Sequence, residues 1–237
     1  MGSASRPQIQ NRLLAAAPFK VRKHLLARCE KVQLALGEVV CRPGEAMHHV
    51  YFPLESFVAM VAPMADGTIQ VGMVGNEGMV GISLMLGVRD SSLHGLVQGS
   101  GSAWKIAAGP FRQEVDRNPG LRQVLNRYLC VLIGQLAQNT GCARFHLVEA
   151  RLARWLLMAR DRAHRNSFFI THEFLSDMLG VRRVGVTNAA SALQAAKLIR
   201  YSRGNVTILN NRGLEAAACE CYREEKLMYE NALGQGA

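Results

Sequence analysis

Residues 178–214 constrain the fold most, because this stretch contains no acidic residue and follows a helix, turn, helix and hairpin pattern. Thr171 is a favourable N-cap residue, and Gly180 is placed to end the helix that begins after Thr171. Beyond this glycine, apolar or small residues recur at helical spacing, at Val186, Ala189, Ala190 and Leu193. We therefore expect a helix-turn-helix whose short connection is formed by residues 181–182.

The segment that follows the second helix predicts a hairpin. Residues 199–209 read as two short strands around Arg203, Gly204 and Asn205. A Gly-Asn pair is a favoured two-residue hairpin turn, so we place the turn at Gly204 and Asn205. The whole segment is therefore expected to be a winged helix-turn-helix.

The charge of this segment indicates a nucleic-acid partner. It carries six cations and no carboxylate, at Arg182, Arg183, Lys197, Arg200, Arg203 and Arg212. A surface of one sign attracts duplex phosphates, because each cation that meets a phosphate releases condensed counterions. The alternative that stays open is a three-helix subdomain whose basic residues form a solvated face.

The outward side of the second helix carries residue types that suit a major groove. Arginine can read guanine, asparagine can read adenine, and valine or a threonine methyl can contact the thymine methyl. The residues predicted to contact DNA here and on the wing are Arg182, Arg183, Val184, Thr187, Asn188, Ser191, Lys197 and Arg203.

Residues 36–111 have a different pattern, in which short apolar, β-branched segments alternate with glycines. The segments are 39–41, 50–52, 57–61, 69–74 and 102–106. Short strands at this density predict a β-sandwich, jelly roll or small barrel, and Asp66-Gly67 is the clearest hairpin turn. Residues 11–30 are expected to be helical before it, and a short helix is expected at 111–115.

A long helix is predicted from about residue 121 to 146. Its leucines are spaced by three, four and seven residues, as in a seam between paired helices, and the predicted dimerisation residues are Leu125, Leu129, Leu132 and Leu136. A buried helix of a monomer is the alternative, because Asn139 and Gly141 interrupt the seam. Helix-turn-helix proteins commonly bind two half-sites as dimers, which favours a homodimer.

Composition excludes several other classes. Of the 237 residues, 49% are hydrophobic, and this content is ample for packed cores. The net charge is +10. The chain has no apolar run of about 18 residues and no apolar signal segment, so we expect a cytoplasmic protein with no membrane partner. No nucleophile motif appears, since Gly81-Ile82-Ser83 does not complete a Gly-x-Ser-x-Gly elbow, and no enzyme is expected.

The cysteines are irregularly spaced, at Cys29, Cys41, Cys130, Cys142, Cys219 and Cys221. In a reducing compartment such spacing argues against a disulfide framework. Cys219 and Cys221 are expected to be too isolated for a zinc site without Cys or His neighbours, and no group of four close cysteines suits an iron–sulfur cluster. Neither a metal nor a cofactor is therefore predicted.

Taken together, the order of parts resembles the catabolite activator and fumarate-nitrate regulator (Crp/Fnr) superfamily over nearly the whole chain. The local matches are Arg42-Pro43-Gly44-Glu45, Phe111-Arg112 with Asn118-Pro119, Arg151-Leu152-Ala153, and residues 180–193. The resemblance implies an α+β fold with a cyclic-nucleotide-binding-like β-roll in 1–118, a central dimerisation helix in 119–147 and a winged helix-turn-helix in 148–237.

In functional terms, the resemblance implies a dimeric, effector-responsive transcription regulator. Its partners would be a double-stranded DNA operator with dyad symmetry and RNA polymerase, and Arg183 would occupy the principal guanine-reading position. A sensor or scaffold that keeps this fold but has lost specific operator binding is the alternative.

The departures from the family concern its effector. Cyclic-nucleotide-binding members use a Gly-Glu pair and a later Arg-Ser or Arg-Thr, whereas this chain has Gly81-Ile82 and Ser91-Ser92. Without those charged contacts a desolvated phosphate is not compensated, so we do not expect ordinary cyclic AMP binding. The candidate effector pocket, for an unknown effector, comprises Gly81, Ile82, Arg89, Ser91, Ser92 and Leu136, with Arg89 either a displaced phosphate partner or an exposed loop residue.

Overall fold

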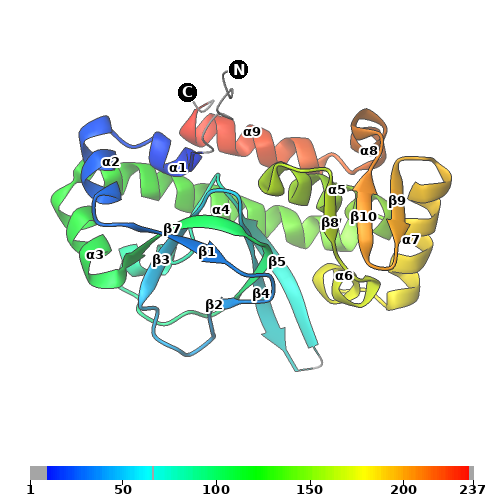
Figure 1. The fold of residues 1–237 in the computed structure, drawn as a ribbon, viewed down its shortest axis with the longest axis horizontal. Coiled ribbons are helices and arrows are strands. Elements are labelled where there is room, and N and C mark those ends of the chain that lie inside the picture. The colour runs from blue at the N-terminus through cyan, green and yellow to red at the C-terminus, as the bar shows by residue number, and fades with distance from the viewer. Residues whose placement is uncertain (1–9, 66, 235–237) are drawn as a thin grey trace, which may run out of the picture.

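The computed structural model describes residues 10–65 and 67–234 (Figure 1). Its N-terminal half opens with α1 (Arg12–Ala15) and α2 (Phe19–Leu26), which precede the strands. Asn11 anchors this start, because its Oδ1 accepts from the Leu14 amide at 3.0 Å and its Nδ2 donates to the Pro53 and Gly78 carbonyls at 3.0 and 2.8 Å. The helical entry segment is therefore tied directly to the β-domain.

Two antiparallel sheets form a β-roll, as the pattern of glycines and β-branched residues predicted. One sheet has the order β1-β7-β3 and the other β2-β6-β4-β5. The strands, with the 3-10 helix η1, are β1 (Glu30–Leu34), β2 (Val39–Cys41), β3 (His49–Pro53), β4 (Phe57–Met64), β5 (Gly67–Val74), η1 (Ile82–Leu86), β6 (His94–Gly99) and β7 (Gly101–Ala107). The β4–β5 hairpin is present with Met64 paired to Gly67, while Asp66 of the predicted turn lies outside the described residues.

Two helices follow the roll, α3 (Ala108–Arg117) and α4 (Pro119–Phe145). Pro119 suits the first helical position of α4, where no backbone donor is needed, and so separates the two helices as predicted. The first of them begins at Ala108 rather than at Phe111. With 27 residues, α4 is about 40 Å long and spans both halves of the molecule in Figure 1.

The leucines of α4 do not share one solvent face, which corrects the predicted seam. Leu125 is fully buried in the core of the roll, and Leu132 packs against the same core. Leu129 is half-buried and Leu136 is 44% exposed. The prediction was wrong for Leu125, because spacing alone cannot distinguish a core-facing stripe from an interface.

The C-terminal half contains α5 (Val148–Ala163), β8 (Ser167–Phe169), α6 (His172–Leu179), α7 (Arg183–Ala195), β9 (Ile199–Ser202), β10 (Asn205–Ile208), α8 (Asn211–Ala217) and α9 (Cys221–Leu233). Its sheet has the order β8-β10-β9, so β8 adds a strand that the sequence pattern did not indicate. The last helix, α9, returns along α4 (Figure 1), close enough that a Cβ on Gly134 would lie 2.3 Å from the Met228 sulfur.

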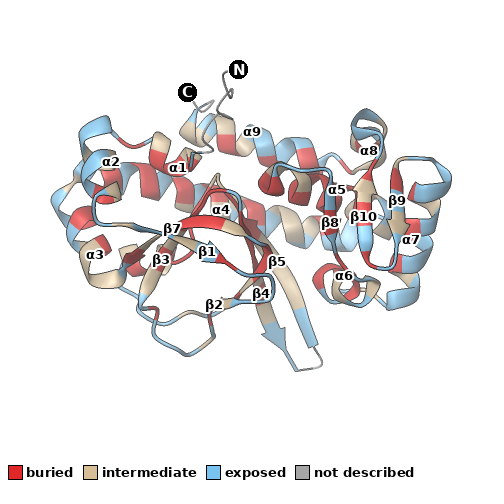
Figure 2. Ribbon diagram, viewed as in Figure 1, coloured by how far each residue is buried: buried red, intermediate tan, exposed pale blue. Residues whose placement is uncertain are grey.

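A second core holds this half together. Leu152, Leu156 and Leu157 of α5 pack with Val186 and Leu193 of α7. Figure 2 shows buried residues along both α5 and α7. The apolar spacing predicted for α7 therefore does face inward.

The two halves also contact each other directly. Met178 of α6 packs against Ala59 and Val61 of β4, and Trp155 Nε1 donates to Gln70 Oε1 at 3.0 Å. The first helix of the helix-turn-helix is thus seated on the roll. No helix within 10–65 or 67–234 combines the length and apolar character needed to cross a membrane.

Candidate nucleic-acid interface

The helix-turn-helix is built by the local signals that the sequence carries. The Thr171 hydroxyl accepts from the Phe174 amide at 3.1 Å and caps α6. Gly180 ends α6 in the left-handed conformation with φ of 61°, which glycine adopts without steric cost. After the two-residue connection, α7 begins at Arg183, as predicted.

The predicted contact residues lie on the outward face of α7, next to its two ends and at the tip of the wing. All eight are exposed: Arg182, Arg183, Val184, Thr187, Asn188, Ser191, Lys197 and Arg203. Val184 is 62% exposed although it is apolar, so it has a free surface that can contact another apolar group. The exposed face of α7 is visible at the edge of the molecule in Figure 2.

Two aromatic residues that the sequence did not single out hold this face in place. His172 stacks on Tyr201 with ring centroids 4.2 Å apart, and its Nδ1 lies 3.1 Å from the Thr187 hydroxyl. Because that hydroxyl donates to the Arg183 carbonyl, it accepts from a protonated Nδ1. Burial and, second, the charge of Arg183 lower the pKa of His172 below its ordinary value, which favours the neutral ring.

The wing hairpin differs from its prediction by one residue. Ser202 pairs with Asn205, so the turn residues are Arg203 and Gly204, with φ of 47° and 81°, and Asn205 begins β10. Only glycine fits at 204, because a Cβ there would lie 2.6 Å from the Phe169 ring. The side chain of Arg203 is left exposed at the tip of the wing.

The cations of this surface have no neutralising partners among residues 10–65 and 67–234. None of the six, Arg182, Arg183, Lys197, Arg200, Arg203 and Arg212, forms an ion pair with another residue in the described part of the chain. Their positive potential therefore extends into solvent, where it can act on a polyanion.

The predicted effector pocket is only partly assembled. Gly81, at φ of 103°, leads into η1, which begins at Ile82, and Met47 lies 3.2 Å from where a Cβ on Gly81 would stand. The amide of Met47 donates to the Arg89 carbonyl at 2.8 Å, while the Arg89 side chain is exposed. The buried methionine therefore occupies the space between η1 and the loop of Arg89.

The remaining pocket residues lie elsewhere or have other partners. Ser91 Oγ donates to the Leu93 carbonyl at 2.6 Å and accepts from the Leu93 amide at 3.1 Å, and Ser92 is exposed. Leu136 lines a separate cavity of about 350 Å³ between β5, α4, α5 and α6, which includes none of the other predicted pocket residues. The prediction that Leu136 belongs to the effector pocket was therefore wrong.

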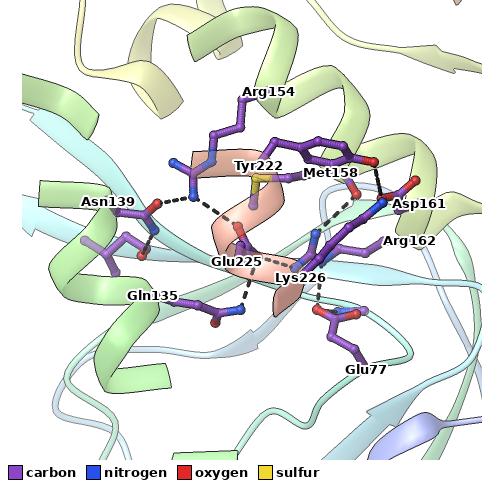
Figure 3. Close-up of polar contacts among 12 residues, drawn as sticks. Glu77, Gln135, Asn139, Arg154, Met158, Asp161, Arg162, Tyr222, Glu225 and Lys226 are labelled. Atoms are coloured by element: carbon purple, nitrogen blue, oxygen red, sulfur yellow. Dashed lines mark hydrogen bonds and ion pairs between the residues drawn. The ribbon is translucent and has the colours of Figure 1, made fainter. Parts of the chain in front are cut away.

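A buried ion network joins the roll to the C-terminal half (Figure 3). Arg162 of α5 pairs with Glu77 at 2.8 Å and with Glu225 at 3.0 Å, and Arg154 also pairs with Glu225 at 3.0 Å. Gln135 of α4 donates to Glu225 at 3.1 Å. Two cations and two carboxylates thus balance in a site that connects the loop after β5 with α4, α5 and α9.

The cysteines give a further correction. The structure places Cys142 and His146 beside Cys219 and Cys221, with their ligand atoms all within 4.8 Å of one another. The prediction that Cys219 and Cys221 lack Cys or His neighbours was therefore wrong, because the chain folds back on the end of α4.

Comparison with known proteins gives the same architecture. Residues 150–217 match the family of Crp-like helix-turn-helix domains. The chain has a Crp-like helix-turn-helix domain and the Crp/Fnr fold. No curated protein sequence matches it.

Three solved Crp/Fnr relatives define the extent of the likeness. A transcriptional regulator of the crp/fnr family from Eubacterium rectale is 16% identical, with a TM-score of 0.66 over 84% of this chain and 94% of the relative. The c-di-GMP-responsive global regulator CLP of Xanthomonas campestris is 16% identical, with a TM-score of 0.64 over 81% of this chain and 99% of that protein. A transcriptional regulator of the CRP/FNR family from Thermus thermophilus is 20% identical, with a TM-score of 0.65 over 80% of this chain and 98% of that protein. The Crp/Fnr fold predicted from the order of parts is confirmed.

Proposed function

We propose that this Crp/Fnr-type protein is a sequence-specific, double-stranded DNA-binding transcription regulator, and not an enzyme. The observation that carries the proposal is the exposed, acid-free face of α7 and the wing, whose cations have no partners among the described residues. Such a regulator works beside the chromosome in the cytoplasm, with RNA polymerase as a further partner.

The roles of the interface residues follow from their chemistry. Arg183 and Asn188 project from the exposed side of α7, where they can meet the acceptors of guanine and the edge of adenine. Val184 offers its exposed methyl groups to a thymine methyl. We assign phosphate contacts, which carry no base preference, to Lys197 just after α7 and to Arg203 at the tip of the wing.

We further propose a homodimer that reads a dyad operator. Leu129, Ile133 and Leu136 form a stripe on α4 that neither the roll nor α9 covers fully, and Ile133 is 59% exposed. Burying such a stripe against a second copy removes apolar surface from water. Two copies would then present two α7 helices to successive major grooves, about 34 Å apart.

Selection from a random DNA library tests the assignment of the reading face. We expect wild-type protein to select a dyad, and Arg183→Ala to cost about 1–3 kcal/mol per half-site and to relax one base pair in each half. Lys197→Ala and Arg203→Ala should weaken all sequences alike. Lys31→Ala, an exposed cation on the roll, is the control and should change neither affinity nor preference.

Two outcomes would contradict this proposal. Identical base preferences for wild type and Arg183→Ala would mean that Arg183 is a phosphate clamp and that the reading face is elsewhere. A folded wild-type protein that selects no sequence would support the alternative, a sensor or scaffold without an operator.

We also propose that the protein does not respond to cyclic AMP in the usual way. Ile82 supplies no carboxylate for a ribose hydroxyl, and the hydroxyl of Ser91 is already hydrogen-bonded to the backbone carbonyl and amide of Leu93. Calorimetry should therefore detect no stoichiometric binding at micromolar cyclic AMP, and a clear isotherm would overturn the inference. The Xanthomonas relative responds to c-di-GMP, so the same titration with c-di-GMP is the first arm of an effector screen.

A further inference from the structure

Three cysteines and one histidine meet where the end of α4 faces the segment between α8 and α9. Cys142 lies in the last turns of α4 and His146 is the residue that ends this helix, so the two side chains are one turn apart. Cys219 and Cys221 come from the segment that leads into α9. All three cysteines are buried, and His146 is half-buried.

The spacing of the ligand atoms suits one small ion. The Cys142 and Cys219 sulfurs are 3.6 Å apart, and the Cys221 sulfur is 3.6 Å from His146 Nδ1. A tetrahedral Zn²⁺, with Zn–S of about 2.3 Å and Zn–N of about 2.0–2.1 Å, puts neighbouring ligand atoms about 3.5–3.8 Å apart. We propose that Cys142, His146, Cys219 and Cys221 bind one Zn²⁺ in a tetrahedral Cys₃His site.

The surroundings of the four ligands fit a bound ion. His146 Nε2 lies 3.0 Å from Glu220 Oε1, so Nε2–H can donate to the carboxylate and leave Nδ1 free for the metal. This carboxylate–histidine–metal arrangement orients the ring. Arg151 lines the cavity that reaches Cys142, where its charge offsets the net negative charge of three thiolates around one Zn²⁺.

Other uses of these cysteines fit the geometry less well. A disulfide between Cys142 and Cys219 would leave the buried Cys221 and the half-buried His146 without a role. An iron–sulfur cluster spreads its ligands over several irons, which requires wider spacing than four atoms within 4.8 Å. Three thiolates and an imidazole converging on one point are the ligand set of a structural zinc site.

The position of the site gives it a structural task. Cys142 and Cys219 are 77 residues apart in sequence, and they join the central helix to the chain that leaves the winged helix-turn-helix. A bound ion would therefore fasten α4 to the DNA-binding half at a point separate from the interface with DNA. This inference is independent of the proposed function, since metal binding requires neither an operator nor a dimer.

Elemental analysis of the full chain, purified under reducing conditions with zinc present, tests the site. We expect one zinc per chain, and replacement by Co²⁺ should give the visible bands of tetrahedral cobalt with thiolate charge transfer in the near ultraviolet. Cys219→Ser should lose the metal, and Glu220→Gln should weaken zinc binding about 10-fold or more. The control is Cys130→Ser, because Cys130 is exposed on the same helix and should leave the metal content unchanged.

The metal content of the wild-type protein tests the proposed zinc site even if a variant fails to fold. Wild-type protein without zinc that gives no cobalt bands on titration would overturn the proposal. A Cys142–Cys219 disulfide found by mass spectrometry under the same reducing conditions would also overturn it, as would equal metal loss in Cys130→Ser and Cys219→Ser.

Discussion

Thr171 and Gly180 define α6 through opposite backbone requirements. The hydroxyl of Thr171 accepts from the Phe174 amide, which has no backbone acceptor in the first turn of the helix. Gly180 adopts the left-handed conformation that ends the helix. Both act within a few residues of their own position. The helix that positions α7 therefore depends on single side chains at its ends.

At this scale we predict that Thr171→Ala lowers the free energy of unfolding by about 1 kcal/mol, because the Phe174 amide loses its acceptor. Urea denaturation at pH 7 measures the change. Thr140→Ala is the control, since Thr140 is exposed inside α4, and its loss should be neutral or slightly stabilising. An unchanged midpoint for Thr171→Ala would show that the cap contributes nothing.

Among the elements, α4 has three environments around its circumference. Leu121, Leu125 and Tyr128 enter the core of the roll, and Gly134 lies against α9. The third side, with Ile133 and Leu136, is exposed. A helix that is partly covered on two sides is available for a partner on the third.

For this element we predict that Ile133→Asp or Leu136→Asp converts the proposed dimer into monomers, because each puts a charge into an apolar interface. Light scattering should then report the mass of one chain in place of two. Leu36→Asp is the matched control, an equally exposed leucine on the roll, and should remain dimeric. If all three variants remain dimeric, the interface is not on this side of α4.

The whole molecule is joined by the buried network around Glu225. Its carboxylate receives both Arg154 and Arg162, and Arg162 reaches on to Glu77 of the roll (Figure 3). Each of these groups is costly to bury alone but is matched by an opposite charge within 3.0 Å. The network therefore makes the two halves energetically dependent on each other.

At the scale of the molecule we predict that Glu225→Gln lowers the free energy of unfolding by about 3–5 kcal/mol. The buried guanidinium of Arg154 then loses the carboxylate that it pairs with, while Arg162 keeps only Glu77. Urea denaturation followed by fluorescence and by circular dichroism measures it. Asp116→Asn removes the exposed partner of Arg122 and should cost less than about 1 kcal/mol. Equal costs for the two variants would mean that the buried network adds no more than a surface pair.

The sequence by itself determined the parts whose causes are local. Thr171, Gly180 and the spacing of Val186 and Leu193 predicted the helix-turn-helix, because caps and helical periodicity act over one to four residues. The strands of the roll and the wing followed from β-branched segments between turns. The exposure of Arg183 and Asn188 on α7 could be anticipated, since their helix face lies opposite the apolar face.

Only the tertiary structure decided what distant segments do to one another. Leu125 and Leu136 belong to the same series of regularly spaced leucines, yet Leu125 is buried under the roll and Leu136 is exposed. The elements that pack against α4 determine which of its sides is covered. The strand β8, the pairing of Glu225 with two arginines, and the meeting of Cys142 with Cys219 have no local signal. Each depends on chain segments brought together by packing, which residue spacing along one segment does not encode.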